Sequence, residues 1–213
     1  MSEAVHFDDG FRAQLRELFI WRRDVRRFRR EALPTGTTER LIEVACLSPS
    51  VGFSQPWRFV IVDSPTRRAA VRAVFAACNG DALARYEGER AARYAALKLA
   101  GLDDAPVHLA VFADRETPTG HGLGRATMPE MIEYSAVAAV CTLWLAARAE
   151  GIGMGWVSIL DPGRVSEILE VPADWRLIGY FCLGYPQADS DHPELERTGW
   201  EERQPLQVCV LHR

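Results

Sequence analysis

The chain has 213 residues, of which 48% are hydrophobic and 25% charged, and its formal net charge at pH 7 is −4. A chain of this size and composition can bury a full core, and a single globular domain over residues 1–213 accounts for it. The acidic balance argues against a nucleic-acid-binding protein, in which basic charge would extend over much of the surface.

The cysteines and histidines indicate neither a disulfide framework nor a metal site. The five cysteines are odd in number, far apart and mostly set in apolar runs, as is typical of reduced core thiols. The five histidines are scattered and form no HExxH or His/Cys cluster, so we expect no metal. The N-terminus lacks the cationic start and apolar stretch of a secretory signal, and we expect a cytoplasmic protein without a membrane segment.

The first expected element is an amphipathic helix over residues 9–21, in which four apolar residues recur at helical spacing. It leads into residues 22–30, which contain six arginines and a single acid, Asp24. Because guanidinium groups bind phosphate oxygens in a planar, bidentate manner, this segment predicts an anion-binding site at the helix end. Two other interpretations stay open: a solvated helix face and a nonspecific polyanion-binding surface.

Asp24 is the unusual residue of this segment. A carboxylate between arginines should stay ionised and be held by hydrogen bonds. It is then either a structural clip that orients the arginines or a charged group directed at something reactive.

A second helix is expected from Thr37, with an apolar stripe that continues to Cys46 before Pro49 ends it. The next stretch, residues 48–57, is dense in small, hydroxyl and amide side chains. Such a loop can bring backbone amides close to a ligand.

The middle of the chain alternates β-rich runs with helical segments. The expected elements are a strand over residues 58–62, helices over 65–78 and 82–100, a strand over 107–113 and a loop over 117–127. The helix over 82–100 is polar, arginine-rich and carries the chain's one lysine, Lys98. The region of about residues 80–105 is therefore as suited to a lid as to the core.

A long helix is expected from Pro129 to Glu150, and its residues 136–147 are apolar on every side. Twelve residues are too few to cross a bilayer. The helix should instead be buried, either at the centre of the domain or between two subunits.

The C-terminal third supplies the remaining elements, which are a strand over residues 156–160, a helix over 162–169 and strands over 177–184 and 206–211. The last strand follows a long polar stretch, which makes it a candidate for pairing with a neighbouring subunit's sheet. Gly151, Gly153 and Gly155 do not have the spacing of a dinucleotide-binding motif. About five strands mixed with five or six helices indicate an α+β fold.

Three segments, residues 22–26, 48–57 and 146–158, resemble the flavin-dependent nitroreductase family. More narrowly, they resemble its flavin-cleaving branch, the aerobic 5,6-dimethylbenzimidazole synthases of cobalamin biosynthesis. The likeness spans roughly residues 11–203. It implies a nitroreductase-like fold with a central, mainly antiparallel sheet. It also implies a homodimer with FMN at the subunit interface, in which a C-terminal arm of about residues 187–213 embraces the partner.

The resemblance carries a set of cofactor-binding residues onto this chain. Arg22, Arg23 and Arg26 would hold the phosphate and ribityl end of FMN, and Arg203 would join them from the tail. The remaining FMN-binding assignments are Asp24, Val25, Ser50, Gly52, Ser54, Gln55, Gly155, Trp156 and Ser158. Ordinary nitroreductases usually carry serine at the position of Asp24, and this replacement, together with Ser158, marks the flavin-cleaving branch.

The reaction implied by the resemblance consumes its flavin. Reduced FMN, supplied by a separate NAD(P)H-dependent flavin reductase, reacts with dioxygen to give 5,6-dimethylbenzimidazole and erythrose 4-phosphate. Asp24 and Ser158 are the candidate catalytic residues, with Asp24 acting on the ribityl side and Ser158 hydrogen-bonded to the ring or to bound oxygen. The lid-like segment, Lys98 included, would close over the ring.

Other functions, and purely structural roles for the residues, are alternatives to these assignments. An NAD(P)H-dependent nitroreductase or flavin reductase on the same fold is one alternative, because a fold does not fix its chemistry. A noncatalytic protein that binds FMN or polyanions is another. Ser54 and Gln55 suit a turn, Ser158 suits an ordinary strand, and Trp156 suits ring packing.

Overall fold

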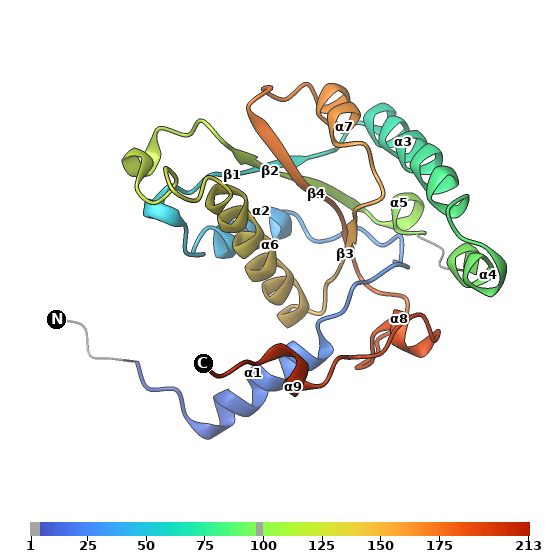
Figure 1. The fold of residues 1–213 in the computed structure, drawn as a ribbon, viewed down its shortest axis with the longest axis horizontal. Coiled ribbons are helices and arrows are strands. Elements are labelled where there is room, and N and C mark those ends of the chain that lie inside the picture. The colour runs from blue at the N-terminus through green and yellow to red at the C-terminus, as the bar shows by residue number, and fades with distance from the viewer. Residues whose placement is uncertain (1–4, 97–99) are drawn as a thin grey trace.

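The computed structural model describes residues 5–96 and 100–213. Within them, a four-stranded antiparallel sheet runs through the centre in the order β1-β2-β4-β3 (Figure 1). The strands are β1 (Trp57–Ile61), β2 (Val107–Asp114), β3 (Gly153–Val157) and β4 (Trp175–Gly184). The predicted α+β fold with a mainly antiparallel sheet is confirmed.

Helices cover both faces of this sheet, which explains why the central strands are almost continuously buried (Figure 1). Leu109 and Val111 of β2 join one core cluster, whereas Ala110 and Phe112 join a second, because successive side chains of a strand point to opposite faces. The first cluster includes residues of α2 (Thr37–Ala45) and α6 (Met131–Ala149), and the second includes residues of α3 (Pro65–Leu83), α5 (Gly101–Asp104) and α7 (Pro162–Leu169).

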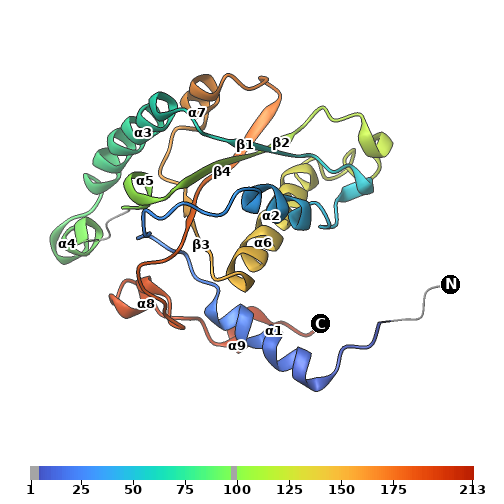
Figure 2. The ribbon, with the colours of Figure 1, turned by 180° about the vertical axis from the view of Figure 1, so that it is seen from behind.

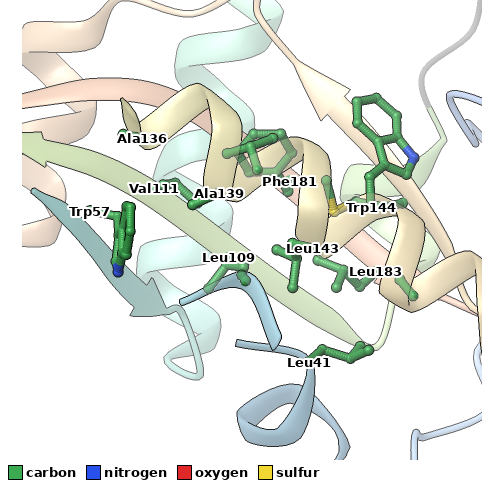
Figure 3. Packing of buried hydrophobic residues seen from close by; sticks show 14 of the residues in the cluster. Leu41, Trp57, Leu109, Val111, Ala136, Ala139, Leu143, Trp144, Phe181 and Leu183 are labelled. Carbon is green, nitrogen blue, oxygen red and sulfur yellow. The ribbon is translucent and has the colours of Figure 1, made fainter. Parts of the chain in front are cut away.

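Helix α6 is the core helix of the first layer. Ala136, Ala139 and Leu143 pack against Val111 and Phe181 of the sheet (Figure 3). In the described chain α6 is the one helix whose length and apolarity would suit a membrane span, but the sheet covers this stripe. The predicted burial is confirmed for that face alone, because the opposite face leaves residues such as Tyr134 and Cys141 exposed.

Helix α1 (Asp9–Trp21) begins and ends where the sequence predicts. Asp8 caps it, with its Oδ1 accepting a hydrogen bond of 2.7 Å from the backbone N–H of Phe11. The helix lies outside the sheet layers, at one end of the molecule (Figures 1 and 2). Phe11, Leu15 and Phe19 therefore leave an apolar face of α1 exposed in the single chain.

The predicted boundaries of β3 are wrong by three residues, because the strand covers residues 153–157 rather than 156–160. The cause is the close approach of another segment. A Cβ atom on Gly155 would lie 2.1 Å from the carbonyl oxygen of Val25, and one on Gly153 would lie 2.8 Å from the Val25 side chain. The glycines therefore belong to the strand, and Ser158 lies just beyond it.

The predicted C-terminal strand is also wrong, which leaves four strands in the described residues instead of about five. Leu206–Cys209 forms a short helix, α9, whose first turn is closed by the Val208 N–H bonded to the carbonyl of Pro205 at 3.0 Å. A strand needs a neighbouring strand with free backbone groups, and alternation of apolar residues cannot supply one. All of residues 201–213 are exposed.

The region predicted as helices over 65–78 and 82–100 divides differently. Helix α3 continues to Leu83. After a break over residues 84–87, α4 (Gly88–Ala96) begins at Gly88, whose φ is +58°. Short helix α8 (Glu194–Arg197) follows β4. Lys98 lies outside the described residues.

His108 and Tyr180 form a buried polar pair between β2 and β4. The Nδ1 atom of His108 lies 2.9 Å from the Oη atom of Tyr180. Burial, with the positive charge of Arg68 adding to it, lowers the pKa of His108 to about 4. The fold therefore accommodates the neutral imidazole.

We predict that His108 makes the fold less stable on acidification. Its pKa is 6.5 without perturbation and about 4 in the fold, so the unfolded chain binds the proton first and stability falls as the pH drops through 6.5 towards 4. This component amounts to roughly 2 kcal/mol between pH 7 and pH 5. Urea unfolding at both pH values measures it. His108→Gln should remove it and exposed His6→Gln should not; an unchanged pH dependence in His108→Gln contradicts the assignment.

Candidate functional site

The start of the arginine-rich segment lies alongside β3 and adds a short extended segment to that edge of the sheet. Asp24 forms a parallel bridge with Met154, and the Val25 N–H donates to the Met154 carbonyl at 3.0 Å. The indole Nε1–H of Trp144 on α6 donates to the carbonyl of Arg23 at 3.1 Å. Backbone contacts on two sides therefore fix where the arginine side chains emerge.

Arginines from both ends of the chain meet in one cavity of about 680 Å³. Arg22 and Arg23 reach it from the segment after α1, and Arg203 reaches it from the tail. The structure thus brings together three of the residues predicted to bind an anion. The other lining residues are Arg16, Phe19, Ile20, Asp191, His192, Pro193 and Glu196. We call this hollow the arginine cavity.

The electrostatics of the arginine cavity favour an anion. Burial lowers the pKa of Arg23, and the positive charges of Arg22 and Arg203 lower it further, whereas Asp191 and Glu196 act in the opposite direction. Arg23 donates from Nη1 to the carbonyl of Arg22 at 2.8 Å and from Nη2 to the carbonyl of Asp191. Its buried Nε has no hydrogen-bond partner among the described residues. An anion with several acceptor oxygens would relieve the repulsion.

Asp24, the residue after Arg23, is held firmly by hydrogen bonds. Its Oδ1 accepts from the Trp156 N–H at 2.8 Å, and its Oδ2 accepts from Nε of Arg26 at 3.4 Å. Burial raises the pKa of Asp24, and the bonds from Trp156 and Arg26 and the charge of Arg22 oppose that rise. The predicted hydrogen bonding is confirmed, but burial outweighs the arginines in its effect on the pKa. The side chain keeps 37% of its surface accessible, so it can still meet a ligand.

Arg26 separates from the other predicted phosphate ligands. It does not line the arginine cavity in the described structure, and it lies with Asp24 at a much smaller hollow formed also by Val25, Gly155 and Trp156. Only 12% of its side chain is accessible. The geometry therefore puts Arg26 in contact with the carboxylate of Asp24.

Ser158 lies just beyond the end of β3, close to Trp156 within that strand. Ser158 is exposed and lies two residues after Trp156, about 7 Å further along an extended backbone. The Trp156 ring is 5.0 Å from the Phe181 ring, and its Nε1 would lie 2.2 Å from a Cβ atom on Gly179. Trp156 thus packs its ring on β4 while its N–H holds Asp24, which leaves Ser158 at the open end.

The loop of residues 48–57 has an unusual backbone. Gly52, Phe53 and Gln55 all have positive φ, at +56°, +55° and +46°. Such conformations of non-glycine residues cost of order 1 kcal/mol or more each and are concentrated at functional sites. Ser50 Oγ accepts from the Gln55 N–H at 3.0 Å, and the buried Ser54 Oγ has no partner in the described part of the chain.

The loop and the arginine-rich segment lie at opposite ends of α6. The Val51 N–H donates to Ser135 Oγ at 3.0 Å near the start of the helix, whereas Trp144 bonds Arg23 nine residues later. At 1.5 Å of rise per residue, these anchor points are about 13 Å apart along the helix. The predicted site residues therefore form two separate groups within one chain, one in and around the arginine-rich segment and one in the loop of residues 48–57.

Some cavity residues escaped the sequence prediction. Arg16 could have been found, because Arg16, Phe19, Ile20 and Arg23 have the i, i+3, i+4, i+7 spacing of one helix face. Asp191, His192 and Glu196 lie in a polar stretch without periodicity, and only the fold brings them to the cavity.

We predict that inorganic phosphate stabilises the protein through the arginine cavity. A ligand at ten times its dissociation constant adds about 1.4 kcal/mol to the free energy of unfolding. Thermal melts with and without phosphate measure this gain. It should be lost in the double variant Arg22→Ala/Arg23→Ala and kept in Arg72→Ala, whose arginine pairs with Asp103 on the surface. Equal gains in all three proteins would place the phosphate elsewhere.

Comparison with known proteins adds independent information. A model of the nitroreductase family matches residues 20–185. The 5,6-dimethylbenzimidazole synthase of Rhodospirillum rubrum is 54% identical over 202 residues, which cover 95% of this chain and 96% of the relative. The enzyme of the same name from Rhodobacter capsulatus is 46% identical over 203 residues, covering 95% and 98%.

A solved structure shows a similar fold with a flavin in place. Iodotyrosine deiodinase bound to FMN and 3-iodo-L-tyrosine has a TM-score of 0.70 and 26% sequence identity, and the match covers 83% of this chain and 91% of that one. The family match includes the arginine-rich segment, the loop of residues 48–57 and β3, but it ends before Arg203.

Proposed function

The chain belongs to the nitroreductase family, and on that premise we propose that it is an enzyme that cleaves reduced FMN with dioxygen to give 5,6-dimethylbenzimidazole and erythrose 4-phosphate. The benzimidazole is the lower ligand of cobalamin. The observation that carries the proposal is the identity of 54% and 46%, over 95% of the chain, with relatives named for this product. No metal is required.

The arginine cavity suits the phosphate of FMN. A phosphate monoester carries nearly two negative charges and three acceptor oxygens, which match the repelling guanidiniums of Arg22, Arg23 and Arg203. A flavin held there by its phosphate would place its ribityl chain and ring towards Asp24 and the neighbouring edge of β3.

Asp24 is proposed as the proton-transfer group on the ribityl side. Burial raises the pKa of Asp24 above its ordinary value, which is the direction that suits a proton-transfer group. The bonds from the Trp156 N–H and Arg26 fix the orientation of the carboxylate. Ser158, exposed at the end of the same edge, is proposed to hydrogen-bond the ring or the oxygen that reacts with it.

The complete site is proposed to form between two chains. One chain alone keeps the loop of residues 48–57 about 13 Å along α6 from the arginine-rich segment, and in this proposal the loop of a second copy brings Ser50, Gly52, Ser54 and Gln55 to the ring. The exposed apolar faces of α1 and α6 support such a homodimer. Contacts with its own chain hold residues 187–200, and Arg203 lines the arginine cavity of the same chain, so the arm that embraces the partner would begin after Arg203.

Two further elements complete the proposal. The reduced FMN comes from a separate NAD(P)H-dependent flavin reductase in the cytoplasm, because the substrate must arrive already reduced. The region around α4 covers the bound ring and limits access of water and nicotinamide.

We predict that Asp24→Asn and Ser158→Gly each bind FMN but fail to make benzimidazole. Loss of a general acid or base costs about 10²- to 10⁴-fold in rate. The assay mixes purified protein with photoreduced FMN and air, without NADPH, and quantifies benzimidazole by chromatography. Asp63→Asn, an exposed carboxylate, serves as the control.

Full yield from either variant refutes the role assigned to that residue. If the unmodified protein instead returns intact flavin and consumes added NADPH, it is a nitroreductase or flavin reductase. Intact flavin without NADPH consumption indicates a binding protein.

We predict complementation between inactive subunits if the site is shared. Asp24→Asn damages one group of site residues, and Ser50→Trp blocks the other. In a two-fold dimer, random pairing makes half of the dimers mixed, each with one intact site, so co-expression should restore about a quarter of normal activity. Activity no higher than that of the two parents would show that each chain holds its own site.

A further inference from the structure

An aromatic cluster joins the α4 region to the tail. The rings of Tyr86 and Tyr94 are 5.0 Å apart, and the Trp200 ring lies 5.6 Å from Tyr86 and 6.2 Å from Tyr94. Arg93 on α4 adds a hydrogen bond of 2.6 Å from Nη1 to the carbonyl of Gly199. Trp200 and its neighbour Gly199 therefore contact a region that is far from them in sequence.

Both sides of this cluster are anchored. The Tyr94 hydroxyl donates to Oδ1 of Asn79 at 2.9 Å, which ties α4 to α3. The Trp200 N–H donates to the carbonyl of Leu195 at 2.8 Å and closes the turn after α8. Gly199, with φ of +68°, lets the chain reverse there. The position of Trp200 is thus fixed by its ring and by its backbone.

Arg203 depends on this anchor. It follows Trp200 by three residues, which span at most about 10 Å of extended chain. Residues 201–203 are all exposed, and in the described structure their one hydrogen bond is the local contact between Glu202 N–H and Glu201 Oε1. Trp200 is therefore the last firmly held residue before Arg203 enters the arginine cavity.

We infer that Trp200 is a positioning residue: clamped by Tyr86 and Tyr94, it holds Arg203 in the arginine cavity and so links the α4 region to recognition of the flavin phosphate. This inference rests on the proposed binding of FMN by its phosphate. An arginine that is held in place before binding loses less conformational entropy when it meets its ligand. Removing the clamp should weaken binding of the phosphate and leave binding of the ring unchanged.

The test compares reduced FMN with reduced riboflavin, which lacks the phosphate, in anaerobic ultrafiltration. Arg203→Ala should weaken FMN binding about 10- to 100-fold, as expected for a lost charge-assisted bond, and leave riboflavin unaffected. Trp200→Ala should weaken FMN binding about tenfold, again without effect on riboflavin. Trp200→Phe should restore most of the FMN affinity, because it keeps an aromatic ring in the clamp.

The double variant Trp200→Ala/Arg203→Ala separates positioning from general destabilisation. It should bind FMN no more weakly than Arg203→Ala, because Trp200 acts through that residue. Trp175→Ala, which removes a half-buried tryptophan packed on Phe112, is the matched control and should leave the ratio of FMN to riboflavin affinity unchanged.

Two results would overturn the inference alone. One is a Trp200→Ala protein that binds FMN like the unmodified protein, or loses both flavins equally, while Arg203→Ala loses FMN selectively. The other is full additivity in the double variant. Equal affinity of the unmodified protein for FMN and riboflavin would overturn both this inference and the proposed phosphate site.

Discussion

The packing of residues 22–26 against β3 is the contact on which the rest of the site depends. Gly153 and Gly155 permit it, because any side chain at Gly155 would collide with the backbone of Val25. The Asp24 carboxylate then takes the Trp156 N–H that a further strand would otherwise use. This one edge therefore orients Asp24 and directs Arg22 and Arg23 into the cavity. A neutral serine at the position of Asp24 could not place one negative charge between an amide and a guanidinium.

Without a bound anion, the positive charges that line the arginine cavity repel one another, and a bound anion would offset that repulsion. Like charges crowd Arg23, and burial adds to the cost of its charge. Two nearby acids relieve this only in part, so the free energy gained on binding an anion includes the release of that repulsion. In the proposed function, specificity for a phosphate with an attached flavin would come from the neighbouring edge of β3 and from the loop of a second chain. The two groups of site residues are separated along α6, and the proposed dimer would combine one group from each chain around one flavin.

Local patterns predicted the helices and the arginine-rich segment well. The helix over residues 9–21 and the helix over 162–169 have clear apolar spacing and capping residues, Asp8 and Asp161, and both were predicted to the residue. Long-range contacts decided what the sequence could not show. The position of β3 depends on Val25, the α9 segment has no strand to pair with in the described chain, and Asp191 reaches the cavity only through the fold. Arg22, Arg23 and Arg203 line one cavity, as expected of residues that share a ligand, and their binding of an anion stays a prediction.

The central claim is that two copies of this chain hold reduced FMN by its phosphate and let dioxygen take the flavin apart. A single-turnover experiment tests it most directly. The protein is loaded anaerobically with one reduced FMN per site and exposed to air without NADPH, and benzimidazole and remaining FMN are then quantified. The account predicts one molecule of 5,6-dimethylbenzimidazole for each flavin lost. Recovery of all the FMN in its oxidised, intact form would contradict it.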